Sequence, residues 1–506
     1  QGAQDYKFYG ISSSIQNVPA GSGNQYLSLG TANSANVTDN GTLDRVSSYF
    51  GRVNYSYKDR YLLTASMRAD GSSKFSEANR WGYFPSVGVG WVITNEKFMQ
   101  SQKLFDNLKL RGSWGKIGNM SVPANLSVLT VTQTPQYVYI GGNGSTATGG
   151  SITTVVPPTT YWERGVGTDV GLEASLLNNK LNAEIDWYNK KTEKAIFDIP
   201  ILGSVGTSSG TIIGNQATFQ NQGFEFLVTW KDRINNDWNY SISANAGINK
   251  NKVLDVSTGA NPIYQQVGPT GSNNFNTRTI VGEPIGEFFG YQVLGIFQSA
   301  QDIADYKSSG GVVVQPNAQP GDFKYQDVNG DGVIDARDKV VIGNPNPKLL
   351  FGINTNVSYK EFDLTLDFQG VSGVQVYNAN LGLRYGTENF TEDFYKNRWH
   401  GQGTSNFYPS ANIGGSTNYL SNSFFVEDGS YFRIRNMQLG YTLPQRYLGK
   451  SGISRLRVYV NAQNALNFFK YRGFSPEVGG SPTRAGVDVN VYPLYATYNF
   501  GVNLTF

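Results

Sequence analysis

Residues 496–506, ATYNFGVNLTF, close the chain and decide its fold. Apolar side chains occupy every second position, and Thr, Asn and Gly stand between them, the apolar set being Tyr498, Phe500, Val502, Leu504 and Phe506. Successive side chains of a β-strand point to opposite faces, so this pattern predicts a strand with one apolar face and one polar face. The fold then depends on whether the apolar face meets a protein core or lipid.

The same alternation recurs along the chain in segments of about ten residues, the length that a tilted transmembrane strand needs. Including 494–506, the segments are 48–57, 61–70, 83–94, 107–117, 169–176, 181–187, 224–230, 238–249, 351–359, 362–368, 430–442 and 455–462. Segment 430–442 slips by one position between Ile434 and Met437, which predicts a β-bulge. This spacing favours a membrane barrel over a soluble β-propeller, which would show a fixed repeat.

The two faces differ in the solvent that they suit. The face opposite the apolar one carries Arg, Asp, Glu and Asn, so we expect it to contact water. Aromatic residues stand at the segment ends, as an interfacial girdle requires, at Tyr57, Tyr61, Tyr359, Phe362 and Phe506. A soluble β-sandwich would instead need a second apolar layer. The sequence therefore predicts an all-β, antiparallel transmembrane β-barrel.

Composition excludes several classes of function. The chain has 506 residues, with 59 Gly, 31 Tyr and 29 Phe, which favours strands and turns. Its net charge of +3 gives no reason to expect a nucleic-acid partner. It has no Cys, so disulfide and thiolate chemistry are absent, and no apolar run long enough for a transmembrane helix. The single His400 and the lack of a paired nucleophile and base predict no enzyme.

The connections predict the topology. Short connections are expected at 58–60, 178–180, 232–236 and 360–361, and long ones at 118–167, 192–221, 249–348, 372–429 and 467–493. Outer-membrane barrels have short periplasmic turns and long external loops. We therefore expect thirteen strands in 48–506, an external region at 1–47 and a long external excursion at 249–348. Because thirteen is odd, we expect an odd number of further strands upstream.

Six stretches carry a resemblance to a known family. They are SYFGRVNYSYKDRYLLTASMRADGSSKF (48–75), RWGYFPSVGVGWVITNEKFM (80–99), NLKLRGSWGKIGN (107–119), YNKKTEKAI (188–196), EDGSYFRIRNMQLGYTLP (427–444) and KYRGFSPEV (470–478). In this order they resemble the SusC/RagA family of TonB-dependent outer-membrane transporters. The resemblance implies a barrel of about 22 strands, of which this chain is the C-terminal part. It also implies an N-terminal plug domain and a TonB-contacting segment, neither of which we recognise in this sequence.

The resemblance implies an energised importer in the outer membrane. A SusD-like surface lipoprotein would cover the barrel mouth as a lid, and TonB–ExbB–ExbD would act through the plug. The substrate expected is an oligosaccharide, with an oligopeptide as the alternative. A structural barrel that binds partners without transport is a further alternative. Tyr395, Trp399 and Tyr408 in an external loop could stack on sugar rings, but loop aromatics also simply pack, which is the interpretation we favour.

One motif has chemistry of its own, DVNGDGVIDARD at 327–338. Its oxygen-bearing residues match the spacing of a twelve-residue calcium loop, with Gly332 at the sharp turn: Asp327, Asn329, Asp331, Val333 (through its carbonyl), Asp335 and Asp338. Asp338 stands where an EF-hand has Glu, and no helical pattern clearly precedes the loop. We expect a structural Ca²⁺ that pins the 249–348 excursion; the alternative is an Asp/Asn/Gly turn without metal.

Overall fold

The computed structural model describes most of the chain. The described residues are 2–17, 31, 36–122, 131–132, 136–138, 146–148, 151–152, 160–200, 211–235, 237–256, 262–268, 274–382, 390–411, 416–449 and 452–506. Within them, strands dominate and α-helices are short. None of the helices in these ranges is long and apolar enough to span a membrane.

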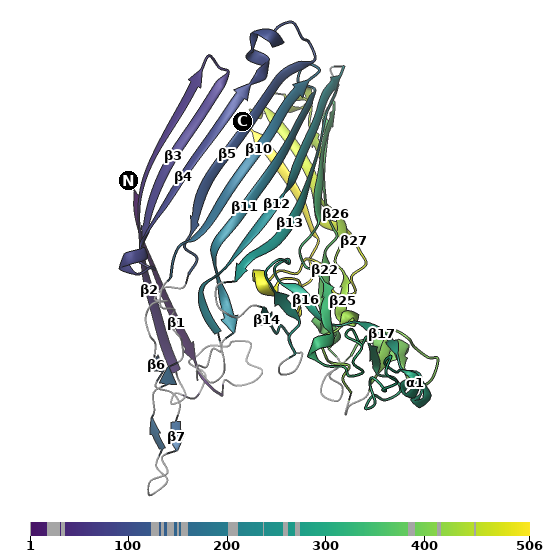
Figure 1. Cartoon of the computed structure of the whole chain (residues 1–506). Coiled ribbons are helices and arrows are strands. Elements are labelled where there is room, and N and C mark those ends of the chain that lie inside the picture. The colour runs from purple at the N-terminus through teal and green to yellow at the C-terminus, as the bar shows by residue number, and fades with distance from the viewer. Residues whose placement is uncertain are drawn as a thin grey trace.

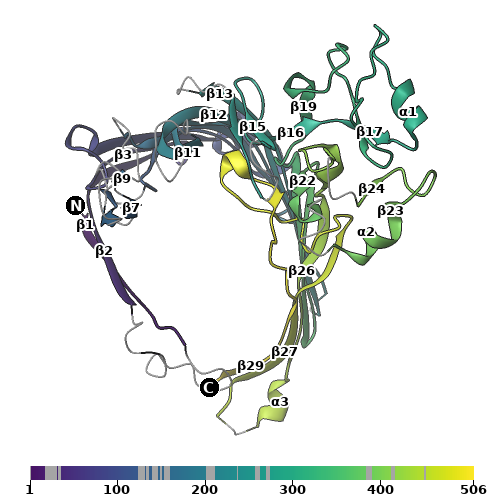
Figure 2. The same cartoon turned by 90° about the horizontal axis from the view of Figure 1, so that it is seen from below.

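A 14-stranded antiparallel sheet forms the body of the molecule and curves into an incomplete barrel (Figures 1 and 2). Strands adjacent in this wall are also consecutive among its strands along the chain, with β1 and β29 at its two ends. In order, they are β1 Gly2–Ser14, β2 Asn36–Tyr57, β3 Tyr61–Ser72, β4 Trp81–Val92, β5 Phe105–Asn119, β10 Glu163–Leu176, β11 Leu181–Pro200, β12 Thr211–Ile234, β13 Trp238–Val256, β20 Leu349–Tyr359, β21 Phe362–Ser372, β26 Tyr431–Thr442, β27 Arg455–Phe469 and β29 Thr497–Thr505. The predicted all-β antiparallel barrel is confirmed in this partial form.

The apolar face of the wall is bare. Val53, Val89 and Phe500 on it are 64%, 57% and 74% exposed, so no second layer among the described residues covers this outer face. At the short-turn end, aromatic rings pair across neighbouring strands, with centroids 4.4 Å apart for Trp238 and Tyr359. An exposed apolar band edged by aromatic rings fits lipid and would be an aggregation hazard in water.

Two of the expected external regions, 1–47 and 192–221, are wrong in large part. Residues 2–14 form β1 and pair with 36–48 of β2, so much of 1–47 is wall rather than external loop. The wall accordingly has 14 strands in place of thirteen, and the argument for an odd number of missing strands no longer holds. Most of the loop expected at 192–221 is also strand, because β11 continues to Pro200 and β12 begins at Thr211. The bulge expected in 430–442 is confirmed, with a register shift between Ile434 and Asn436.

The short connections lie together at one end of the wall, and the long ones at the other. At the short-turn end, Lys58, Asp59 and Lys360 adopt positive φ in tight turns, and α3 (Gln445–Leu448) lies in the connection between β26 and β27. At the long-loop end, two-stranded ribbons join β6 (Val131–Thr132) to β9 (Ser151–Ile152) and β7 (Gln136–Val138) to β8 (Thr146–Thr148).

A folded cap lies at the long-loop end, below the wall in Figure 1. It comprises the described parts of 262–348, 373–428 and 470–496. Its elements are β14 Ile263–Gln265, β15 Thr277–Thr279, β16 Glu287–Tyr291, β17 Val293–Ile296, α1 Ala300–Asp305, β18 Phe323–Tyr325, β19 Lys339–Gly343, β22 Gln375–Asn378, α2 Glu392–Asn397, β23 Arg398–Trp399, β24 Tyr408–Ser410, β25 Val426–Asp428 and β28 Val487–Asp488.

The cap has a hydrophobic core of its own. Phe288, Phe323 and Tyr377 are at most 1% exposed and pack with residues from all three cap segments. Thr277 donates a hydrogen bond to the carbonyl of Thr483, which joins the first and third segments. The excursion expected at 249–348 is therefore a packed unit, and its first residues, up to Val256, prolong β13.

Candidate functional site

The inner face of the wall carries a continuous ladder of amide side chains. Asn436 donates to Asp367 Oδ2 (3.1 Å), Asn461 to Asn436 Oδ1 (2.5 Å) and Asn499 to Asn461 Oδ1 (3.3 Å). Asn354 donates to the same Asp367 carboxylate from the other side. The ladder therefore crosses five strands, from β20 to β29, and leaves a polar surface rich in both donors and acceptors.

A charged cluster occupies the inner face of β5, β10 and β11. Arg111 reaches three carboxylates, at 2.9 Å from Asp169, 2.8 Å from Glu173 and 2.7 Å from Asp186. Lys109 lies 3.1 Å from Glu173. Gly171 makes room for this arrangement, because a Cβ there would lie 1.8 Å from Asp186 Oδ1.

A recess lies at the long-loop end of the inner face, beneath the segment between β27 and β29. Its volume is about 310 Å³. Arg433 and Glu477 form an ion pair on its lining. Nη1 of Arg433 lies 2.5 Å from Oε2 of Glu477, and Nη2 lies 2.7 Å from Oε1. Phe474, which is 70% exposed, contributes an aromatic ring. The other lining residues are Tyr431, Ala465, Asn467, Phe469, Ser475, Pro476 and Leu494.

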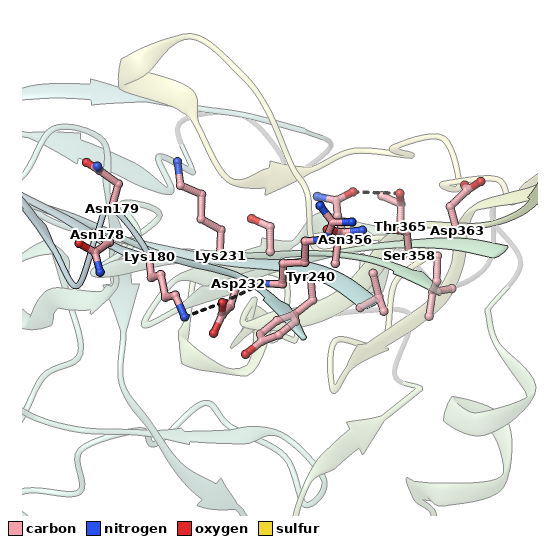
Figure 3. Close-up of a pocket in the computed structure, with 15 residues that line it drawn as sticks. Asn178, Asn179, Lys180, Lys231, Asp232, Tyr240, Asn356, Ser358, Asp363 and Thr365 are labelled. Carbon is pink, nitrogen blue, oxygen red and sulfur yellow. Dashed lines mark hydrogen bonds and ion pairs between the residues drawn. The ribbon is translucent and has the colours of Figure 1, made fainter. Parts of the chain in front are cut away.

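A second hollow, of about 540 Å³, lies at the short-turn end across β12, β13, β20 and β21 (Figure 3). Lys231 and Asp363 point to one side of the sheet there, and Lys180, Asp232 and Tyr240 to the other. Lys180 Nζ lies 2.8 Å from Asp232 Oδ1 at the strand ends. Alternation thus places charged and amide groups on the inner face down to the short turns.

Charged side chains hold the cap together through ion pairs and hydrogen bonds. Arg472 lies 3.1 Å from Glu427, donates to the hydroxyl of Tyr408 (2.7 Å) and faces the rings of Phe407 and Phe424. Burial, the largest single influence, would lower the pKa of Arg472, but the hydrogen bonds and charge interactions with Glu427 and Tyr408 together outweigh it and the pKa is raised. Burial raises the pKa of Glu287, and the hydrogen bond from Arg278 opposes the rise.

The molecule is thus a curved wall with a bare apolar outer face, a polar inner face and a folded cap over its long-loop end. Comparison of the chain with known proteins identifies a family with this geometry. The family described as TonB-dependent receptor-like β-barrel matches residues 2–465. The chain belongs to the TonB-dependent receptor β-barrel family. It is of the SusC/RagA type within that family, and its place is the outer membrane.

Relatives and solved structures agree on this assignment. TonB-dependent receptor P26 of Formosa agariphila is 34% identical over 91% of this chain, and TonB-dependent receptor SusC of Bacteroides thetaiotaomicron is 30% identical over 92%. The chain spans 46% and 44% of these two receptors. The structure of the RagAB peptide transporter superposes with a TM-score of 0.78 at 25% identity, over all of this chain and 52% of that one.

For a TonB-dependent receptor barrel, the short-turn end is periplasmic and the cap is external. The predicted calcium loop therefore lies on the outside of the cell. Both carboxylate oxygens of Asp327 accept backbone N–H groups, from Gly330 (2.7 Å) and Gly332 (2.9 Å). Gly332 has a φ of +85°, as the sharp turn requires. The turn has the folded-back form that a loop of oxygen ligands needs.

The remaining carboxylates of this loop are engaged within the protein. Arg337 Nη2 lies 2.6 Å from Oδ2 of both Asp331 and Asp335. The buried Asp338 accepts the backbone N–H groups of Val328 (2.9 Å) and Asp335 (2.8 Å), which caps a short 3₁₀ turn. Among the described residues, no three acidic or His side chains converge as a metal site. The oxygen atoms of this loop are of the kind that binds Ca²⁺. The positively charged guanidinium of Arg337, however, already pairs with Asp331 and Asp335.

The aromatic candidates from the external loop have different surroundings. Tyr408 is 7% exposed and its hydroxyl donates to Asp393, so this ring packs within the cap, the alternative to stacking on a sugar. Trp399 is half-buried and donates to Gln298 (3.2 Å). Tyr395 is exposed beneath the Arg398 guanidinium. His400 contacts the carbonyl of Arg398.

Sequence reasoning missed the aromatic residues that the fold leaves open near the mouth. Phe474 lines the recess beside the Arg433–Glu477 pair, and Tyr492 and Tyr495 are 81% and 70% exposed shortly before β29. These residues were hard to recognise as functional candidates in the sequence, because isolated aromatic residues in a long connection resemble loop residues that merely pack. The motif 470–478, which contains Phe474, was the best available pointer.

Proposed function

We propose that this chain is the C-terminal wall and external cap of a TonB-dependent importer that takes up oligosaccharides across the outer membrane. The observation that carries the proposal is the amide ladder from Asn354 to Asn499 on the inner face. Neutral amides both donate and accept hydrogen bonds, so they suit a hydroxyl-rich ligand that sheds water along the wall. Exposed Phe474 and Tyr495 near the mouth provide flat apolar surfaces for sugar rings.

In this mechanism the chain supplies surfaces rather than chemistry. The outer face holds the wall in lipid, the inner face solvates the passing ligand, and the cap provides the docking surface for a SusD-like lipoprotein lid. TonB–ExbB–ExbD would supply energy through the plug domain, elsewhere in the whole protein. The two edges of the wall, β1 and β29, also need further strands, because unpaired backbone groups in lipid cost several kcal/mol each.

Oligopeptide uptake is the second candidate, and the likeness to the RagAB peptide transporter favours it. Charged groups on the inner face, such as the Arg433–Glu477 pair, would suit peptide backbones and termini. A structural barrel that binds partners without transport is the third candidate, from a different class.

Uptake by whole cells separates these three. Cells with the gene deleted, and the same cells with it restored, are supplied with labelled maltoheptaose-sized oligosaccharides or with labelled oligopeptides. We expect deletion to abolish oligosaccharide uptake and restoration to recover it, in both cases only while the proton gradient is intact. Loss of peptide uptake alone would favour the second candidate. Unchanged uptake of both, with co-purification of unrelated outer-membrane machinery, would overturn import.

We also propose that the loop 327–338 binds Ca²⁺ through Asp327, Asn329, Asp331, Asp335, Asp338 and the carbonyl of Val333. The support is the folded turn around Asp327 and the oxygen-only donor set. Binding would require Arg337 to release Asp331 and Asp335. The ion would then stiffen this edge of the cap.

A further inference from the structure

A recess of about 450 Å³ opens in the inner face where β13, β20, β21 and β26 run side by side. Its polar lining comes from four different strands: Asn245, Asn354, Asp367, Gln369 and Arg435. The recess adjoins the amide ladder, since Asn354 and Asp367 belong to both. It is distinct from the recess under the 467–493 segment, with which it shares no residue.

A glycine keeps the recess open. Gly352 lies on the inner face between Asn245 on β13 and Gln369 on β21, its direct partners in the sheet. A Cβ at Gly352 would lie 3.1 Å from Asn245 Oδ1 and 3.3 Å from its Nδ2. Any side chain here would therefore press on the Asn245 amide and fill the space.

The bulge in β26 aims a guanidinium at this space. Asp367 pairs with Asn436 and the next residue, Phe368, pairs with Ile434, so Arg435 is the extra residue of the bulge. Bulges re-aim side chains and are features of functional strands. In a regular strand, the consecutive residues Arg435 and Asn436 would point to opposite faces. The extra residue of the bulge allows both side chains to lie on the inner face.

Arg435 differs in its electrostatics from three other arginines of the inner face, whereas Arg52 and Arg455, which also have no ion pair among the described residues, do not line this recess. Arg111, Arg433 and Arg457 each form an ion pair with a carboxylate. Arg435 is exposed, and no carboxylate among the described residues pairs with it. The carboxylate on the lining of the recess, that of Asp367, accepts from Asn354 and Asn436. The Asn245 amide on the opposite side of the recess is also exposed and has no hydrogen-bond partner among the described residues.

We propose that this recess is a subsite for an anionic group, a carboxylate or sulfate, carried by an oligomer. Arg435 would bind two of its oxygens in parallel, Asn245 would donate to one of them, and the amides of the ladder would bind neighbouring hydroxyls. A guanidinium matches the planar geometry of a carboxylate, and charge-assisted bonds are stronger than neutral ones. This inference rests on the proposed import function and narrows its substrate class to anionic oligosaccharides.

The test uses the full-length protein, purified from outer membranes in detergent with its co-purifying partners. Binding is measured by isothermal titration with tetragalacturonate, neutral maltotetraose, and tetra-alanine with a free or an amidated C-terminus. We expect wild type to prefer tetragalacturonate to maltotetraose. Arg435→Gln should weaken tetragalacturonate binding by roughly tenfold or more, the effect of losing a charge-assisted pair, and leave maltotetraose unchanged. Arg435→Lys should recover part of the affinity.

The matched control is Arg446→Gln, which removes the same charge from an exposed position on α3 at the other end of the wall. It should bind tetragalacturonate as wild type does. Equal weakening by both variants, or an Arg435→Gln affinity within twofold of wild type, would overturn the subsite. If only the free C-terminus of tetra-alanine depends on Arg435, the anion site stands and its source is a peptide. Unchanged uptake after deletion of the gene, with intact anion binding by the purified protein, would instead overturn the proposed function alone.

Discussion

Arg433 and Glu477 join the wall to the external cap through two parallel ion-pair contacts. Nη1 and Nη2 of Arg433 lie 2.5 and 2.7 Å from the two carboxylate oxygens of Glu477, and Nη2 also donates to Gln369 (2.9 Å). The Arg433 side chain is only 9% exposed. Arg433 belongs to the sequence motif at 427–444 and Glu477 to the motif at 470–478, so two motifs that are separate in sequence form one contact.

Glu477→Gln should therefore loosen the segment between β27 and β29. The variant leaves a mostly buried guanidinium with a neutral partner, which costs on the order of 1–3 kcal/mol of local stability. Hydrogen exchange of peptides from 467–493 should become faster. The control is Glu392→Gln, because Glu392 pairs with Lys396 on an exposed helix, where such pairs contribute little. Equal exchange in wild type and Glu477→Gln would contradict a clasp at this position.

Two glycines of β10 should respond differently to an added methyl group. A Cβ at Gly171 would lie 1.8 Å from Asp186 Oδ1, whereas a Cβ at Gly167 meets nothing within 4 Å. Gly171→Ala should push Asp186 away from Arg111 and lower the unfolding temperature of the purified barrel. Gly167→Ala should leave it unchanged or slightly higher, because alanine restricts the unfolded chain. Heat-dependent mobility on gels reads out both variants, and identical behaviour would refute the crowding around Asp186.

The wall could be predicted from the sequence because the face that each side chain occupies depends only on its neighbours in the same strand. Side chains of one strand must alternate between lipid and water, so the pattern at Tyr498–Phe506 is enough to assign both faces. The bulge at Arg435 was also readable, since a single slip in alternation leaves a visible break. β1 was missed as a whole strand, because Asp5 to Phe8 alternate but Tyr9 and Ile11 then interrupt the pattern, and the long ends of β11 and β12 were missed as well.

The cap and its sites could not be predicted, because their contacts join residues far apart in sequence. Asn274 donates to the carbonyl of Tyr419, and Arg472 gathers Glu427 and Tyr408 around itself. The alternation of apolar and polar residues along the sequence does not indicate contacts of this kind. For the same reason, the sequence alone did not decide whether Tyr408 packs or lies open, and Phe474 passed unnoticed although it lines a recess.

Calcium binding by the loop 327–338 should depend on Arg337. Since Arg337 holds Asp331 and Asp335, Arg337→Gln frees both carboxylates and should strengthen binding of Tb³⁺, a luminescent substitute for Ca²⁺. Asp331→Asn should weaken it several-fold, and Asp305→Asn, on the exposed end of α1, should have no effect. Tb³⁺ luminescence excited through tyrosine and displaced by Ca²⁺ measures all three. Absence of Ca²⁺-displaceable luminescence in wild type and in Arg337→Gln would refute the calcium site.

Alkaline pH should destabilise the cap through its buried tyrosines. Burial, with smaller contributions from Asp338 and Asp335, raises the pKa of Tyr291 to about 12. The folded state therefore favours the neutral phenol, so this stability is complete below the unfolded value of about 10 and is lost as the pH rises from there through 12. Tyr291→Phe removes the ionisable group and should spare about 1 kcal/mol of this loss at pH 11.

Burial also raises the pKa of Tyr325, so part of the alkaline loss should persist in the variant. Near-ultraviolet circular dichroism during heating at pH 8 and pH 11 gives the comparison, with Tyr395→Phe as the exposed control. If Tyr291→Phe loses as much stability as wild type between these two pH values, Tyr291 does not contribute to the alkaline transition.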